Sequence, residues 1–305
     1  MGEALMFRAG SGEGGSYTFI TEIFESSASF TVPTGVKNNE FHVRIFGGGG
    51  SGFVNTSDWG SGGGGGWMNN ALLTLQPGTA ISVTIGVGGT QIYTNSSGKA
   101  GGSSSFGTYL SANGGSGGNN RTGGSGGSGG GASGSYNVNG GTGYQFGGGA
   151  VRATQNGNVG VGGSMGGNGG LTTSRSNLDS ENGINTVTII SEADSFNADG
   201  IGYGLCGDNR GGGGGYGANG GSEGCGGGGG YGAAGFGGSS DGYGAGGGGA
   251  YGPGGGRYTP LTNDGWLDED NTISITASRG GGGAGIQGLL NGGNGICIIQ
   301  YYKKG

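Results

Sequence analysis

Glycine is the feature of this sequence that most restricts the fold: 95 of the 305 residues are glycine, and most of them lie in blocks. The blocks span residues 47–66, 114–134, 200–256 and 280–295, and the segments between them are short and rich in β-forming residues. Ordinary proteins contain about 7% glycine, so this composition excludes most folds and leaves few side chains for catalysis. The blocks are either flexible linkers or packed backbone, and the predicted function depends on which is right.

The apolar residues are few and unevenly distributed. Leu, Ile, Val and Phe together account for 50 of the 305 residues, which is below the roughly 20% under which chains are often disordered. The net charge of −6 is too small to keep the chain open by repulsion. Because the apolar residues concentrate near the two ends of the chain, we expect one body with a modest β core and a middle that contains few aliphatic side chains.

Charge and cysteine content restrict the partners and the compartment. The pI near 4.7 and the thin spread of 12 Lys and Arg residues argue against a nucleic-acid partner. No apolar run reaches the roughly 18 residues of a membrane span, so no membrane insertion is expected. The N-terminus lacks the basic start and apolar core of a signal peptide, which predicts folding in a cytoplasm with reduced thiols. Cys297 is predicted to fill the core, whereas pairing of Cys206 with Cys225 stays open.

Alternating apolar residues predict β-strands near both ends of the chain. In residues 41–46, Phe41, Val43 and Ile45 share one face. The same alternation in residues 80–87 predicts one shared face for Ile81, Val83, Ile85 and Val87. Further strands are predicted at residues 17–25, 29–32, 67–75, 103–110, 272–277 and 295–302, with turns at 33–35 and 76–78. This distribution predicts an all-β fold, an antiparallel β-sandwich of jelly-roll type with little or no α-helix.

The glycine blocks carry a three-residue period of their own. From Gly114 onward, two glycines and a polar residue recur, with Ser116, Asn119, Ser125 and Ser128 in the third position. Three residues per turn is the period of a polyproline-II-type helix, which has no internal hydrogen bonds, and glycine lets such helices bond to one another through their backbones. We therefore expect an inserted polyglycine-II bundle over residues 114–270, between strands in 16–113 and 271–305. Gly/Ser coil is the alternative.

The order of several short motifs resembles a known family. Residues 30–36 (FTVPTGV) are followed by 43–50 (VRIFGGGG), 75–78 (LQPG), 83–89 (VTIGVGG) and 102–106 (GSSSF), and the chain closes with 292–301 (GGNGICIIQY). In this order they resemble the glycine-rich tail-fibre and tail-adhesin proteins of bacteriophages. The resemblance implies a β-sandwich carrying a polyglycine bundle and a role in attaching a tail to the host cell surface. By analogy it implies a homotrimer, with a monomeric tip as the alternative.

Motifs associated with catalysis or metal binding lack their structural context. Residues 123–127 match the GxSxG pattern of serine hydrolases but follow no strand and open no helix, and the single histidine, His42, has no evident partner. Matches to GxGxxG are expected by chance at this glycine content. The acidic residues 268–270 lack the spacing of a calcium loop, so a solvated turn is the favoured interpretation. We therefore predict no catalytic residue, no cofactor and no metal site.

Loops that interrupt the glycine blocks are the predicted binding surface, because loops carry function when a rigid scaffold presents them. They contain Tyr and Trp, which supply contact area at low entropy cost, and Asn and Ser for hydrogen bonds. The alternative for each aromatic residue is that it only fills the edge of the bundle. The candidate receptor-contact residues are Trp59, Tyr136, Tyr144, Phe146, Arg175, Tyr258 and Trp266.

Together these observations predict a non-enzymatic tail-fibre or tail-tip adhesin of a phage or phage-like contractile particle. It would be made in the bacterial cytoplasm without a signal peptide, join other tail or baseplate subunits in the virion, and bind a host bacterial surface glycan or protein. Residues 1–15 are compatible with a docking peptide and equally with disordered residues, and residues 16–305 form the glycine-rich body. One alternative is a purely architectural baseplate or fibre-joint subunit. A degradative tail enzyme is a third hypothesis, which requires close carboxylates that the sequence does not identify.

Overall fold

A computed structural model describes residues 5–8, 16–54, 60–90, 96–120, 122–130, 141–145 and 291–305. In these residues nearly all regular structure is β-strand, and the one helical element is a single 3₁₀ turn, η1 (Lys37–Asn39). The prediction of an all-β fold with antiparallel strands is therefore confirmed for the described part of the chain.

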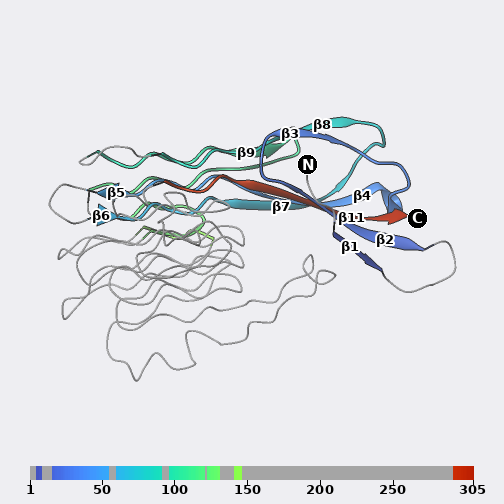
Figure 1. Cartoon of the computed structure of the whole chain (residues 1–305), viewed down its shortest axis with the longest axis horizontal. Coiled ribbons are helices and arrows are strands. Elements are labelled where there is room, and N and C mark those ends of the chain that lie inside the picture. The colour runs from blue at the N-terminus through green and yellow to red at the C-terminus, as the bar shows by residue number, and fades with distance from the viewer. Residues whose placement is uncertain are drawn as a thin grey trace, which may run out of the picture.

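The larger sheet has five strands, each antiparallel to its neighbours. Their order is β1 (Leu5–Arg8), β2 (Tyr17–Phe24), β11 (Ile296–Lys304), β4 (Glu40–Phe46) and β7 (Met68–Thr74). These strands are rich in Ile, Phe and Thr, which suit a pleated, half-buried surface. Because β11 lies between β2 and β4 and bonds to both, segments from the two ends of the chain share one sheet, as predicted (Figure 1).

The smaller sheet has four antiparallel strands. Their order is β10 (Leu110–Ala112), β9 (Ser104–Phe106), β8 (Ala80–Thr84) and β3 (Ala28–Thr31), and a separate short pair joins β5 (Phe53–Val54) to β6 (Gly60–Ser61). The predicted turn before β8 is present, since Pro77 pre-sets its own φ and Gly78 adopts a φ of 80°. The Thr79 N–H donates to the Gln76 carbonyl at 3.2 Å and closes this turn.

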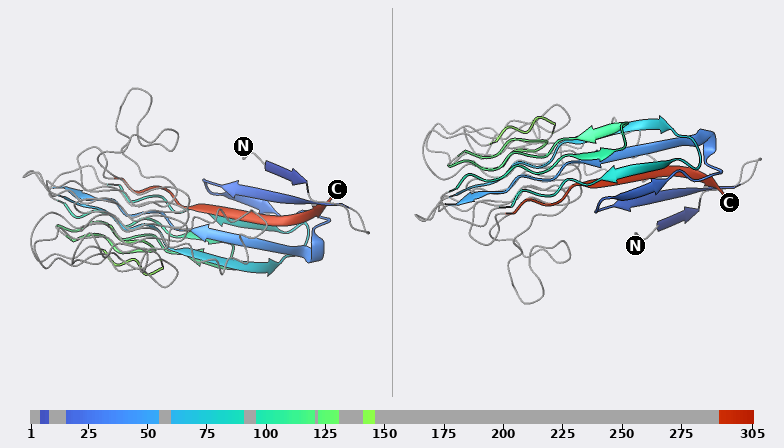
Figure 2. Two further views of the ribbon diagram at one scale, coloured as in Figure 1. Left: turned by 90° about the horizontal axis from the view of Figure 1, so that it is seen from below. Right: turned by 90° about the horizontal axis from the view of Figure 1, so that it is seen from above.

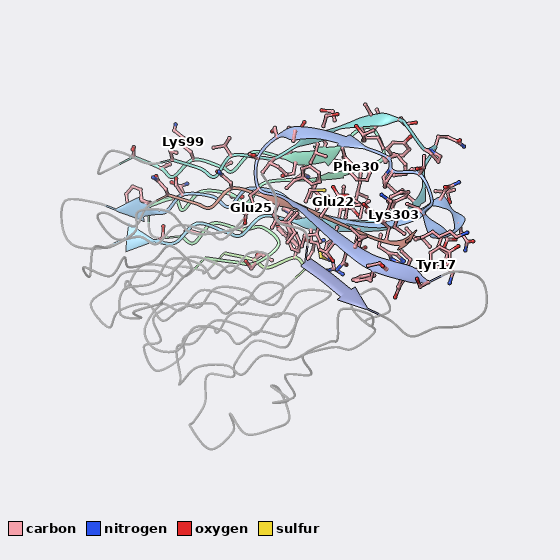
Figure 3. The ribbon with its side chains drawn as sticks, turned by 45° about the vertical axis from the view of Figure 1, so that its right-hand side comes forward. Tyr17, Glu22, Glu25, Phe30, Lys99 and Lys303 are labelled. Carbon is pink, nitrogen blue, oxygen red and sulfur yellow. The ribbon has the colours of Figure 1, made fainter. Side chains whose placement is uncertain are left out.

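One hydrophobic core takes side chains from both sheets. The ring of Phe30, which is labelled in Figure 3, contacts the rings of Phe24, Phe41 and Phe106, with centroid distances of 6.3, 5.9 and 5.9 Å. Burial of a large apolar side chain contributes about 1.5–3 kcal/mol, so this cluster is a main source of stability. The predicted shared face of Phe41, Val43 and Ile45 on β4 is confirmed, because all three are buried in this core. They are joined there by Ile299 of the adjacent β11 and by Ile81 and Val83 of β8 in the other sheet.

Cys297 is a core residue, as predicted. Its thiol is free and fully buried in the same cluster, and burial raises its pKa to about 12. The question of pairing between Cys206 and Cys225 lies outside the described residues, as does the strand predicted at residues 272–277.

The periodicity of burial changes from two to three where β8 ends. Within β8, Ile81 and Val83 are buried and their neighbours are exposed. Beyond the strand, Val87 is 64% exposed, so the prediction that it shares the buried face is wrong. A buried glycine pair follows Val87, and Thr90 is the next exposed residue. The chain has left the sheet and is packed on several sides, so that every third residue points to solvent.

The same period appears in the block that follows β10. Asn113, Ser116 and Asn119 are exposed, while Gly115 and Gly118 are buried. Over residues 113–119 the three-residue repeat of the sequence is therefore also a repeat of burial. Further along the block the pattern changes, because Ser128 is fully buried.

Glycine-rich segments continue from the strand ends and bond to one another across the two sheets. The Gly48 N–H donates to the Gly102 carbonyl at 2.9 Å, and the Trp67 N–H donates to the Asn113 carbonyl at 2.9 Å. Sheets packed through side chains lie about 10 Å apart, so these bonds form only where no side chains separate the layers. Figure 2 shows the coloured segments running on from the strands, side by side, in both views.

A methyl group would not fit at many of these glycines. A Cβ at Gly66 would lie 1.9 Å from the carbonyl oxygen of Gly47. At the boundary between strands and glycine segments, the buried Ser104 hydroxyl donates to the Phe46 carbonyl at 2.7 Å and accepts from the Gly86 N–H at 2.9 Å. The positions of the glycines thus set where the two layers come into backbone contact.

Candidate functional site

Tyr144 is the one predicted contact residue that lies in the described part of the chain. Its side chain is 52% exposed. The others, namely Trp59, Tyr136, Phe146, Arg175, Tyr258 and Trp266, lie outside the described residues, and their role stays a prediction.

Tyr144 stacks on Trp67, the residue that precedes β7. The ring centroids are 5.0 Å apart and the ring planes differ by 16°. The main chain of Trp67 is bonded on two sides, since its N–H donates to Asn113 at 2.9 Å and its carbonyl accepts from Gly47 at 3.0 Å. A stacked pair of this kind contributes about 0.5–1.5 kcal/mol beyond its area burial. The Tyr144 ring is therefore oriented by a neighbour that is itself fixed.

The side chain of Gln145 bonds to Met68 of β7 in both directions. Its Oε1 accepts from the Met68 N–H at 2.6 Å, and its Nε2 donates to the Met68 carbonyl at 2.7 Å. These bonds reproduce, on the outer edge of β7, the pair that a neighbouring strand would make. They hold the residue next to Tyr144 against the larger sheet and occupy backbone groups that an edge strand otherwise presents.

The main chain of the same segment bonds to a glycine block. The Tyr144 N–H donates to the Gly126 carbonyl at 2.9 Å, and the Gln145 N–H donates to the Gly127 carbonyl at 3.1 Å. Gly127 in turn donates to the Gly65 carbonyl at 3.0 Å. The segment of Tyr144 and Gln145 is thus held in two ways. Its main chain bonds to the glycine block, and the Gln145 side chain bonds to the edge of β7.

Two exposed amide side chains follow Trp67 in β7. Asn69 and Asn70 are both exposed. The Asn69 Nδ2 donates to the Ser111 carbonyl at 3.0 Å, and its Oδ1 accepts from the Asn70 N–H at 2.9 Å. No charged side chain occurs in residues 67–75 or 141–145. Because side chains alternate along a strand, Asn69 and Asn70 point to opposite faces of β7, and Asn70 lies opposite Arg44 of β4.

Sequence reasoning missed two residues that orient and hold the segment of Tyr144, namely Trp67 and Gln145. Trp67 was predicted only as the first residue of a strand, although an aromatic residue directly after a glycine block is a signal that could have identified it. Gln145 has no such signal, because its role depends on a contact with Met68, 77 positions away in the sequence.

Shifted pKa values in the sheets have structural causes. Burial raises the pKa of Tyr301, and the hydrogen bond that its hydroxyl donates to Glu22 Oε1 at 2.6 Å raises it further. Burial lowers the pKa of His42, although the nearby Glu40 carboxylate acts in the opposite direction. Within the described residues, no three His, Cys, Asp or Glu side chains are grouped as metal ligands. The prediction of a non-enzymatic protein stays a prediction.

Comparison with known proteins leaves the resemblance to tail adhesins as an expectation from sequence motifs. No protein-family model matches the chain, and no curated protein matches it significantly. In the part of the chain that the structure describes, no helix has the length and hydropathy of a membrane span.

Proposed function

We propose that this chain is a structural tail-fibre or tail-tip adhesin of a phage or phage-like contractile particle. It is made in the bacterial cytoplasm, joins other tail or baseplate subunits in the virion, and binds a glycan or protein of the host cell surface. The observation that carries the proposal is the exposed Tyr144 ring, oriented by Trp67 and fixed through Gln145 on a scaffold of glycine backbone.

The scaffold in this proposal is a jelly-roll-like β-sandwich that carries a polyglycine-II bundle. The shared core of the two sheets supports the sandwich. Gly48 and Gly49 support the bundle, because these two consecutive residues bond to four different segments. The Gly48 N–H donates to residue 102 and its carbonyl accepts from residue 115, while the Gly49 N–H donates to residue 293 and its carbonyl accepts from residue 89. A β-strand bonds to only two neighbours in one plane, whereas a three-fold helix bonds outward in several directions.

The glycine segments of this scaffold suit recognition because backbone hydrogen bonds hold them together, so that their exposed side chains can contact a ligand. Rigid aromatic residues on an ordered backbone lose little conformational entropy on binding. The alternative, an architectural baseplate or fibre-joint subunit, uses the same scaffold but requires no presented aromatic residue. The exposed and doubly fixed Tyr144 therefore favours the adhesin.

Adhesion to intact bacteria tests the proposal. Purified, fluorescently labelled protein is incubated with a panel of bacterial strains, and bound protein is measured by flow cytometry. The adhesin binds a subset of strains in a saturable manner. Folded protein that adheres to no strain of the panel would contradict the proposal and favour the architectural role. Light scattering on the same sample distinguishes the expected homotrimer from a monomeric tip.

A further inference from the structure

We propose that Asn113 is a site of spontaneous deamidation, at which the backbone nitrogen of Gly114 attacks the side-chain amide and water completes the conversion to aspartate or isoaspartate. The inference does not depend on the proposed adhesin function. It rests on a comparison of the three Asn–Gly pairs in the described part of the chain, at residues 113–114, 291–292 and 294–295.

The reaction needs no partner other than water. A base removes the proton of the Gly114 N–H, the nitrogen forms a bond to Asn113 Cγ, and the Cγ–Nδ2 bond breaks with release of ammonia. The product is a cyclic imide, and water opens it at either carbonyl to leave aspartate or isoaspartate. An accessible N–H without a hydrogen-bond acceptor therefore distinguishes a reactive Asn–Gly pair from a protected one.

The two pairs that precede β11 are protected, because their glycine N–H groups are bonded and buried. The N–H groups of Gly292 and Gly295 donate to carbonyls within residues 86–89 at 2.9 and 2.8 Å, and both glycines are buried. The Asn294 side chain is held as well, since its Oδ1 accepts a backbone N–H of the same segment at 3.0 Å. Attack at either pair requires the two glycine segments to separate first.

The pair at Asn113 differs in both respects. Among the described residues the Gly114 N–H has no hydrogen-bond acceptor, and Gly114 is half-buried beside the exposed Asn113. The Ser103 hydroxyl donates to Asn113 Oδ1 at 3.4 Å and so polarises the amide that is attacked. One bond opposes the reaction, because the Asn113 carbonyl accepts from the Trp67 N–H at 2.9 Å and ring closure turns this peptide unit. We therefore expect the native protein to react more slowly than the unfolded chain.

The packing of the glycine segments keeps the reactive pair in place. A Cβ at Gly114 would lie 2.0 Å from the Gly101 carbonyl oxygen, so a bulkier residue that would hinder the attack does not fit. Isoaspartate inserts a methylene group into the main chain beside the Trp67 bond and adds a negative charge. It should therefore loosen the junction between β10 and the glycine segment, where the Gly115 N–H donates to the Gly48 carbonyl at 2.9 Å.

Peptide mapping of protein aged at pH 8 tests the inference. Trypsin releases residues 100–121, which contain Asn113, and residues 280–303, which contain both control pairs. Mass spectrometry with electron-transfer fragmentation assigns aspartate and isoaspartate to individual positions. In the native protein we expect Asn113 to convert at least about tenfold faster than Asn291 and Asn294, which corresponds to the one backbone hydrogen bond that must open at each of those pairs. Conversion of Asn291 or Asn294 as fast as Asn113, or an Asn113 that converts no faster than they do, would overturn the inference.

The same protein aged in urea shows whether the fold causes the difference. There the three asparagines should convert at similar rates, because each precedes a glycine and no native bond protects it. A difference between them that persists in urea would assign the effect to local sequence and contradict the structural argument.

Hydrogen exchange tests the consequence for the junction. The fraction of aged protein that loses protection at the Trp67 amide should equal the fraction converted at Asn113. Asn113→Gln is the matched control, because glutamine keeps the amide but cyclises far more slowly, and its Trp67 amide should stay protected on ageing. Full protection of Trp67 in converted protein would show that the junction tolerates isoaspartate and would overturn this part of the inference.

Discussion

Replacement of Gly101 by alanine tests whether the glycine segments are in direct backbone contact. A Cβ at Gly101 would lie 2.1 Å from the carbonyl oxygen of Gly48 and 2.7 Å from that of Gly49. At the adjacent Gly102, the nearest atom would be the Val87 nitrogen at 3.1 Å. Since packed interiors leave no free space for a methyl group, Gly101→Ala requires the neighbouring segment to retreat by about 1 Å, whereas Gly102→Ala requires a few tenths of an ångström.

The expected cost of Gly101→Ala follows from the bonds that such a retreat disturbs. Gly48 and Gly49 take part in four backbone hydrogen bonds of 2.8–2.9 Å to other segments. Overpacking costs about 1–3 kcal/mol, and each buried backbone group left without a partner costs about 1–3 kcal/mol more. Alanine lowers the conformational entropy of the unfolded chain, which stabilises the folded state of both variants by about 0.4–1 kcal/mol. We therefore expect Gly101→Ala to lower the free energy of unfolding by about 3–5 kcal/mol, and Gly102→Ala to change it by less than about 1 kcal/mol.

Urea unfolding followed by circular dichroism measures this difference, with Gly102→Ala as the matched control. Hydrogen exchange adds a local readout, because amides of residues 47–52 and 98–103 should lose protection in Gly101→Ala only. Equal stability of the two variants would refute the reasoning, since it would mean that a methyl group at Gly101 meets no backbone. Uniformly fast exchange of both segments in the wild type would also contradict the proposed bundle.

Three further predictions concern the sheets. Ser104→Ala removes a buried hydroxyl that bonds two backbone groups, so we expect a loss of about 1–3 kcal/mol in urea unfolding, against little change for Ser105→Ala. In a Cys206→Ser/Cys225→Ser background, Cys297 should be inert to a thiol reagent at pH 8 until denaturant is added, because it is buried and its pKa is raised to about 12; rapid labelling of the native protein would contradict this. Tyr301 has a pKa raised above its unfolded value of about 10, so its contribution to stability is complete below that pH and is lost as the pH rises. The free energy of unfolding should therefore fall less steeply above pH 10 in Tyr301→Phe than in the wild type, and parallel slopes would refute this assignment.

The strands were predictable because each depends on a local pattern. Phe41, Val43 and Ile45 alternate with polar residues, and the structure buries them in the shared core. Most predicted strand boundaries differ from the observed ones by few residues, as with residues 17–25 against Tyr17–Phe24. The single strand predicted at residues 103–110 is wrong, because a turn at Gly107, with a φ of 51°, separates β9 from β10 and lets the two strands pair with each other. Such patterns extend over only a few residues. They arise because one face of a pleated strand is buried, and this burial involves the same few residues.

The features that the sequence left undetermined depend on contacts between distant residues. Val87 continues the apolar alternation of β8 in the sequence. After Thr84, however, the chain packs against glycine segments and no longer against a second strand, and Val87 is exposed. Likewise the Gln145 side chain replaces a missing strand at the edge of β7. Nothing in the residues near position 145 indicates this role, because the partner is set by how the glycine segments stack.

The period of buried residues changes from two in the strands to three in the glycine segments. This change explains how a chain with few apolar residues can fold while some of its exposed side chains take no part in packing. In the sheets, side chains fill the space between layers, so that a substitution at Phe30 or Ile45 changes the core. In the glycine segments, paired glycines make the interlayer contacts, and the third residue is exposed at Ser116 and Thr90 but buried at Ser128. Where the third residue is exposed, packing and display fall on different positions of the repeat. Tyr144 also separates the two roles, since its N–H bonds to Gly126 while the residue is 52% exposed. A scaffold held by backbone can change such outward residues without loss of the contacts that fold it, and this property suits a protein whose proposed task is to recognise a variable surface.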